Sequence, residues 1–227
     1  MTMLLLAAIA FVGTHFLLSH PLRAPLVRVM GEPAFLGVYS VIAVATLIWM
    51  IVAYRSAPFT ALMWEVGSVL WAIVTLLMLI ASVLLAGSLV GNPAFPKPGA
   101  SATAPGVARG VYAVTRHPML WSFAIWGFAH ILVYPTAKTF IVTMAIVILS
   151  LIGAALQDKK KERLQPDVWP QWERQTSFIP FAAIIAGKAR LGGFGAIAII
   201  GGLIFWLVAT WAHIPLSGGR AGVWRWF

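Results

Sequence analysis

Long stretches without a charged residue alternate with short polar or basic segments along the whole chain. An apolar run of about 18 or more residues is long enough to cross the hydrocarbon core of a bilayer as an α-helix. Such runs predict membrane-spanning helices near residues 1–19, 33–54, 66–85, 118–137, 139–157 and 192–214. We therefore expect an all-α, polytopic transmembrane helical bundle with about six membrane-spanning helices, in which residues 1–227 form a single integral membrane domain.

The segments between these runs differ in length and chemistry. Residues 134–138 alone join the fourth and fifth runs, which predicts a tight antiparallel hairpin. Residues 94–116 are rich in Pro, Gly and Ala and indicate an irregular loop. Residues 158–190 begin with a basic run and continue into an amphipathic, Trp-rich segment. The first run lacks the positive flank and small-residue cleavage site of a signal peptide, so we expect an uncleaved helix.

Composition supports a membrane protein and removes several kinds of chemistry. Hydrophobic residues make up 61% of the 227 residues and charged residues 10%, whereas soluble domains carry about 25% charged residues. The absence of Cys excludes disulfides, thiolate metal ligands, covalent c-type haem attachment and a Cys nucleophile. We interpret the net charge of +10 as a signature of membrane topology, with the lipid bilayer as partner and no nucleic acid.

The basic residues predict an orientation. If six spans alternate in direction, one side of the membrane receives only Arg55, Lys138, Arg220 and Arg225 among the 16 Lys and Arg residues. The remaining twelve fall on the other side, which the positive-inside rule assigns to the cytoplasm. They are Arg23, Arg28, Lys97, Arg109, Arg116, Lys159, Lys160, Lys161, Arg163, Arg174, Lys188 and Arg190. The loop 158–190 is then cytoplasmic, both termini face outward, and residues 159–161 are expected to contact anionic lipids.

Histidines are the candidate functional groups, because ionisable residues inside a membrane are rare and often functional. His15 lies inside the first predicted span and His130 deep in the fourth, whereas His20, His117 and His213 lie near span ends. His117 and His130 are 13 residues apart, about 20 Å along a helix, so they cannot share one metal ion. A shared site needs one histidine from each of two helices.

His15 and His130 are the two most deeply placed histidines, and they form our candidate metal-binding pair. His130 shares a helical stripe with Phe123, Trp126 and Tyr134. Two imidazoles between aromatic, apolar walls suit haem, but buried histidines also serve as hydrogen-bonding groups between helices. One observation opposes the pair, since His130 lies about 10 Å deeper than His15 by helical rise.

One motif resembles a known family. Thr-Arg-His-Pro at residues 115–118 is followed 13 residues after its histidine by His130. This pattern resembles the NnrU family of bacterial membrane proteins, whose plant and cyanobacterial relative is 15-cis-zeta-carotene isomerase. The likeness extends over most of residues 1–181 and includes the segments 11–15, 19–21, 37–40, 110–121, 126–130 and 158–181.

The resemblance implies a cofactor and a setting. NnrU proteins are associated with nitric oxide reduction during denitrification, which implies the bacterial inner membrane. The isomerase uses haem b, with axial histidines that match His15 and His130 and a further important histidine that matches His117. With Arg116 and Trp126 these three histidines form our predicted cofactor-binding set. The isomerase carries a Cys, thought to be an alternative iron ligand, where this chain has Gly127.

A second, more remote resemblance supplies a rival hypothesis. The isoprenylcysteine and phospholipid methyltransferase superfamily also carries Arg-His-Pro before a membrane helix, and Arg116-His117-Pro118 with the segment 169–180 is similar to its S-adenosylmethionine site. Lys160 and Lys161 stand where that superfamily has paired Glu residues. Lysines there would repel the positive charges of the cofactor, unless a register shift brings Glu162 into their place.

Together these features predict an NnrU-like integral membrane haem b protein linked to nitric oxide and denitrification redox chemistry. Three alternatives stay open. They are a carotenoid-type cis-trans isomerase, a membrane S-adenosylmethionine-dependent methyltransferase and a non-catalytic assembly factor. The expected small-molecule partner is nitric oxide or an apolar compound, and the sequence leaves open whether the protein is an enzyme.

Overall fold

The computed structural model describes residues 1–95 and 106–227, and the described chain is helical with no strand. Lys97 and much of the predicted irregular loop 94–116 lie outside the described residues. The elements are α1 Thr2–Ser19, α2 Arg23–Met30, α3 Glu32–Ser56, α4 Ser68–Ser88, α5 Val111–Val114, α6 Pro118–Val133, α7 Ala137–Leu164, α8 Trp169–Gln175, α9 Ala182–Ile185, the π-helical η1 Ile197–Gly201, α10 Gly202–Ser217 and the 3₁₀-helical η2 Gly222–Trp226.

The predicted polytopic helical bundle is confirmed, with one difference in its count of spans. Within the described residues, α1, α3, α4, α7 and the continuous helix Ile197–Ser217 are long and apolar enough to cross a membrane. The fourth predicted span, 118–137, is shorter than expected, because α6 has 16 residues and ends at Val133. Tyr134 leaves the helical conformation before Pro135, which has no N–H to continue the hydrogen-bond ladder. The predicted tight hairpin follows, since α7 begins at Ala137.

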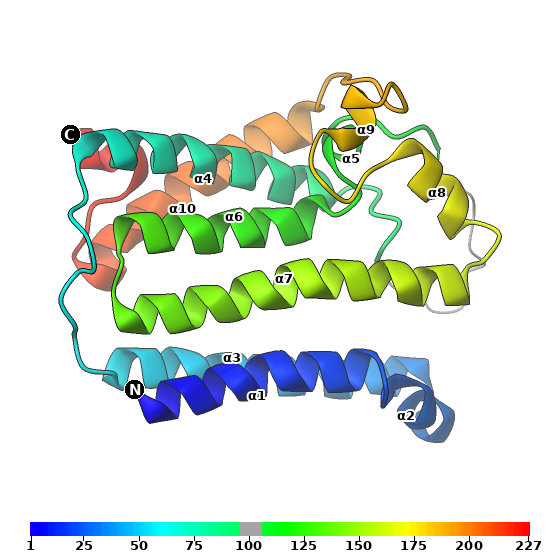
Figure 1. Ribbon diagram of the computed structural model, residues 1–227, viewed down its shortest axis with the longest axis horizontal. Helices are drawn as coiled ribbons and strands as arrows, with labels where there is room; N and C mark the ends of the chain where they lie inside the picture. The colour runs from blue at the N-terminus through cyan, green and yellow to red at the C-terminus, as the bar shows by residue number, and fades with distance from the viewer. Residues whose placement is uncertain (96–105) are drawn as a thin grey trace.

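The long helices form a bundle in which each packs on its neighbours in a fixed order. Helix α4 packs against both α10 and α6, α6 packs against α7, α7 packs against α1, and α1 packs against α3. Figure 1 shows this order as successive layers, with α7 between α6 and the α1–α3 pair. Helices far apart in this order are therefore separated by others.

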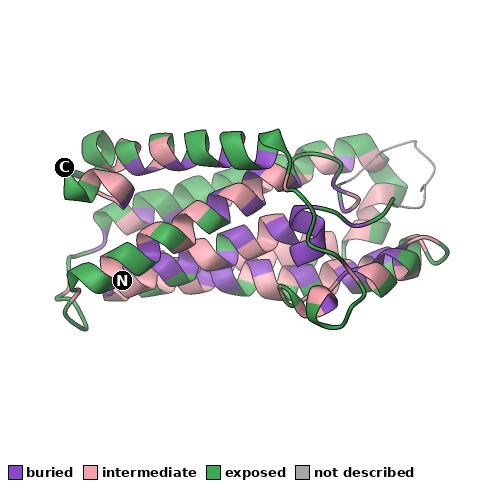
Figure 2. Ribbon diagram, turned by 90° about the horizontal axis from the view of Figure 1, so that it is seen from above, coloured by how far each residue is buried: buried purple, intermediate pink, exposed green. Residues whose placement is uncertain are grey.

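The outer faces of the bundle are apolar and exposed. Figure 2 shows buried residues on the faces where helices meet and exposed residues on the outward faces. Large side chains such as Val41, Val69 and Ile204 are 68%, 76% and 56% exposed. Water-soluble proteins rarely expose apolar surface this continuous, whereas lipid tails solvate it without cost.

The short helices gather at one end of the bundle. Helices α2, α5, α8 and α9 lie where α1 ends and α6 begins, and both chain termini lie at the opposite end (Figure 1). At that opposite end Tyr134 and the following hairpin connect α6 to α7. We call the two ends the cap end and the terminal end.

Candidate functional site

A buried polar network ties the Arg-His-Pro motif to α7 and α8 at the cap end. Pro118 opens α6, so that Arg116 and His117 immediately precede the helix. Arg116 Nε donates to Asp158 Oδ2 at 2.8 Å, and His117 Nε2 donates to Asp158 Oδ1 at 2.8 Å. The Arg116 guanidinium also lies 3.5 Å from the carboxylate of Glu173 on α8. We call these four residues the Asp158 network.

Both oxygens of Asp158 are satisfied, which makes a buried carboxylate tolerable. The side chains of His117 and Asp158 are only 1% and 8% exposed. A buried carboxylate without partners is strongly unfavourable, whereas charge-assisted hydrogen bonds offset its lost hydration. Burial raises the pKa of the Glu173 carboxyl, Arg116 opposes this, and the carboxylates of Asp158 and Glu162 add to the rise. The network therefore fixes the start of α6 against α7 and α8.

Asp158 was not among the sequence-predicted site residues. It lies one residue beyond the predicted span 139–157, where a carboxylate resembles an ordinary boundary residue. Its position could have identified it, because Asp158 lies at the same end of the bundle as Arg116 and His117. A buried cation such as Arg116 requires an anion nearby.

The Trp-rich segment that follows α7 packs on this network. Thr115 Oγ1 and Trp121 Nε1 each donate to the carbonyl oxygen of Phe178 at 2.8 Å. Trp169 and Trp172 are 0% and 3% exposed, and they belong to a buried apolar cluster. These tryptophans therefore form a core for the cap end.

Lys161, which departs from the methyltransferase pattern, makes contacts within the protein. Lys161 Nζ donates to the carbonyl oxygen of Pro93 at 3.2 Å and lies 5.7 Å from the centre of the Trp169 ring. Arg116 and His117 are held by Asp158. The side chains that resemble part of an S-adenosylmethionine site are thus engaged within the protein.

His15 belongs to α1, about one turn before that helix ends at the cap end, and its side chain contacts α3. Its Nδ1 donates to the carbonyl oxygen of Phe11 at 2.6 Å. Its ring packs edge-on against Phe11 and against Tyr39 of α3, with ring centres 4.5 Å and 5.6 Å apart.

His130 lies beside His213 of α10 at the terminal end. The two rings are 6.1 Å apart between centres and nearly parallel, with 25° between their planes. Trp126 packs on His130 with ring centres 4.2 Å apart. His130 Nδ1 donates to the Trp126 carbonyl oxygen and His213 Nδ1 to the Ala209 carbonyl oxygen, each at 2.8 Å.

The structure does not bring His15 and His130 together. Helix α7 lies between α1 and α6, and both pack against it (Figure 1). The two histidines also lie near opposite ends of the bundle, because α1 runs toward the cap end and α6 runs away from it. Of the predicted set, Arg116 and His117 meet at the cap end, Trp126 and His130 meet at the terminal end, and His15 lies apart from both groups.

His213 was expected near a span end and outside the candidate pair, and the structure makes it the neighbour of His130. Sequence reasoning placed His130 deep in a 20-residue span, 118–137. Because α6 ends at Val133, His130 lies about one turn from the terminal end, where α10 also presents His213.

The donors of the His130–His213 pair are imidazole nitrogens, a type of ligand that haem iron takes. A carbonyl oxygen can only accept, so the proton of each neutral ring lies on Nδ1 and the lone pair on Nε2. Two imidazoles bound to one metal ion from opposite sides have ring centres about 6 Å apart, because each metal–nitrogen bond is about 2 Å long. Among the described residues, no group of three or more His, Cys, Asp or Glu side chains could hold a metal ion. Haem needs only one or two protein ligands.

Gly127 occupies a tight contact with α7. A Cβ atom there would lie 2.6 Å from Val147 Cγ2 and 3.1 Å from the carbonyl oxygen of Thr143. A cysteine at this position would therefore point into the α6–α7 interface.

Comparisons with known proteins agree with the motif. A family model described as NnrU protein matches residues 3–221. The chain is also similar to the chloroplastic 15-cis-zeta-carotene isomerase of Zea mays, with 29% identity over 82 residues, which are 36% of this chain and 22% of that protein. The matched stretch of this chain thus covers less than a quarter of that relative's length. No solved structure matches it significantly.

Proposed function

We propose that this chain, which belongs to the NnrU family, is an integral membrane haem b protein whose iron is bound by His130 and His213. The observation that carries the proposal is the pairing of two imidazoles on different helices, 6.1 Å apart between ring centres. Both rings are held by backbone carbonyls that leave Nε2 available. In this proposal His213 is the second iron ligand, a role for which the sequence predicted His15.

The surroundings of the pair support this role. Trp126 packs on His130 and restrains its ring, and it adds apolar surface of the kind that a macrocycle contacts. Haem b would supply one-electron chemistry at the terminal end, and it would bind a small gas such as nitric oxide only if one histidine left the iron. The role of the protein residues is to hold the group, orient it and keep water away.

We propose that the protein takes part in nitric oxide or related redox chemistry, because it belongs to the NnrU family. A polyene isomerase is the second candidate, favoured by the local similarity to the carotene isomerase. The packing at Gly127 opposes the cysteine-dependent version of that reaction, because this chain has no space for a thiol at that position.

Absorption spectra of the purified full chain and four single variants test the ligand pair. We expect low-spin haem in the wild type and loss of haem or a high-spin spectrum in His130→Ala and His213→Ala, since each removes one iron–nitrogen bond. His20→Ala is the matched control at the cap end, and it should keep the wild-type spectrum.

His15→Ala distinguishes the two possible pairs. An unchanged spectrum supports His213 as the second ligand, whereas loss of low-spin haem in His15→Ala with none in His213→Ala would restore the His15–His130 pair. A wild type that stays colourless after haem supplementation would reject the haem function, and saturable S-adenosylmethionine binding by that protein would favour the methyltransferase.

We propose that the chain lies in the bacterial inner membrane with its cap end in the cytoplasm, because twelve of the 16 Lys and Arg residues were assigned to that side. In intact cells, Lys188→Cys should resist a membrane-impermeant thiol reagent and Arg220→Cys should react with it. The natural chain has no Cys, so labelling reports only the introduced residue. Labelling of Lys188→Cys before lysis would reverse the orientation.

A further inference from the structure

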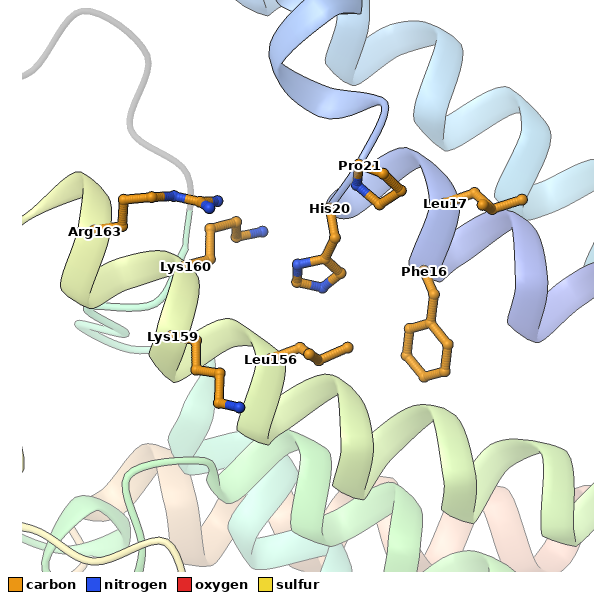
Figure 3. A pocket seen from close by; sticks show the side chains of 8 residues that line it. All are labelled: Phe16, Leu17, His20, Pro21, Leu156, Lys159, Lys160 and Arg163. Carbon is orange, nitrogen blue, oxygen red and sulfur yellow. The ribbon is translucent and has the colours of Figure 1, made fainter.

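A cavity of about 550 Å³ opens between the end of α1 and the last turns of α7. It is distinct from the histidine pair, which lies at the other end of the bundle. Figure 3 shows His20 at the end of α1 facing α7, with Lys160 and Arg163 pointing toward the same space and Lys159 at its edge. Its walls thus come from two helices that are far apart in sequence.

The polar wall of this cavity is made of nitrogen groups alone. In the part of the chain that the structure describes, His20, Lys159, Lys160 and Arg163 line it, and no carboxylate does. Among the described residues, no Asp or Glu forms an ion pair with these three cations. The nearby Arg23 is already paired with Glu32. The three cations around this space repel each other, and an anion would relieve that repulsion.

The wall of the cavity nearer the membrane is apolar. Phe16 of α1 and Leu156 of α7 line the part of the cavity that lies on the membrane side of His20 and Lys160. Both residues belong to the apolar stretches that predict the membrane spans. The cavity therefore offers cations at the level of lipid headgroups and hydrocarbon at the level of the first acyl carbons.

We propose that this cavity is a binding site for an anionic phospholipid. The phosphate lies among His20, Lys160 and Arg163, and the beginning of an acyl chain packs on Phe16 and Leu156. A free phosphate ion would use only the polar wall, and a neutral lipid only the apolar wall. The site goes beyond the proposed haem function and does not depend on it.

His20 makes the site responsive to pH. Burial lowers the pKa of His20, and Lys160 and Arg163 lower it further, so the ring is neutral at pH 7. The groups that face it are Lys159, Lys160 and Arg163 of α7. A bound phosphate favours the protonated ring, so binding takes up a proton and strengthens as pH falls. Burial and neighbouring cations lower the pKa of Lys160 to about 8, so Lys160 is already protonated below pH 7. A phosphodiester does not titrate there either, which leaves His20 as the group that changes charge below pH 7.

Lipid binding by the full chain in nanodiscs of phosphatidylcholine tests the proposal. Titration with a fluorescent phosphatidylglycerol should give saturable binding, and the double variant Lys160→Gln, Arg163→Gln should weaken it about tenfold. The matched control is Lys188→Gln, Arg190→Gln, which removes the same charge from two exposed residues outside the cavity. An equal loss in both double variants would show non-specific attraction and overturn the proposal.

Two further arms separate the possible ligands. Inorganic phosphate should compete at least a hundredfold more weakly than short-chain phosphatidylglycerol, and equal competition would contradict a lipid site. Binding should tighten several-fold between pH 7.0 and pH 5.5 in the wild type but not in His20→Gln. A dependence that persists in His20→Gln would remove His20 from the site.

Discussion

Replacing Asp158 by Asn is expected to lower the free energy of unfolding by about 3 kcal/mol, because it leaves buried donors without an anion. Asp158 accepts from both Arg116 and His117 at 2.8 Å. An Asn side chain keeps one acceptor oxygen but removes the negative charge that pairs with Arg116, and its NH₂ group faces His117 only if that ring changes tautomer. The start of α6 should then loosen from α7 and α8.

The matched control for this substitution is Asp167→Asn, the same chemical change at an exposed residue of the turn after α7. Its cost should be within about 0.5 kcal/mol of zero, as for most surface substitutions. Thermal unfolding in detergent, followed by circular dichroism, compares the two. Equal midpoints for both variants would mean that the Asp158 network contributes little to stability.

Replacing Gly202 by Ala is the second change with a large expected effect. A Cβ atom at Gly202 would lie 2.7 Å from Val83 Cα and 2.9 Å from Val83 N, which are backbone atoms of α4. Backbone cannot move aside as a flexible side chain can, so α10 must separate from α4. Overpacking of this kind costs about 1–3 kcal/mol. The shift should also disturb the position of His213, which lies on the same helix.

Gly201→Ala provides a control one residue away. A Cβ atom there would meet only Ala86 Cβ at 3.6 Å, an ordinary contact. Because Ala favours a helix by about 1 kcal/mol over Gly, this variant should be neutral or slightly more stable than wild type. Thermal midpoints that fall equally in both variants would show that the α4–α10 contact at Gly202 is not tight.

The membrane-spanning architecture could be predicted from the sequence because lipid imposes a simple rule of length and apolarity. Five of the six expected runs form helices long enough to span the membrane. The extent of α6 could not be read from apolarity alone, since Tyr134 and Pro135 continue the uncharged run while ending the helix. The helix ends because Pro135 has no backbone N–H, and the hydrophobic pattern does not show this.

The candidate site was harder to predict because it depends on which helices are neighbours. The motif identified Arg116, His117 and His130, but it carries no information about the partners of these residues. Asp158 becomes a partner because α7 returns beside α6, and His213 becomes one because α4 packs against both α6 and α10. The spacing of two histidines along one helix shows whether they can bind the same metal ion. It does not show which helix packs beside them.

Haem titration of the purified full chain is the most direct test of the proposal that His130 and His213 share one iron. We expect saturation at one haem per chain, with the absorption bands of low-spin iron. The double variant His130→Ala, His213→Ala should form no low-spin complex, while its thermal midpoint stays near that of the wild type without haem. No saturable binding by the wild type, or the same low-spin spectrum in the double variant, would contradict the shared iron site.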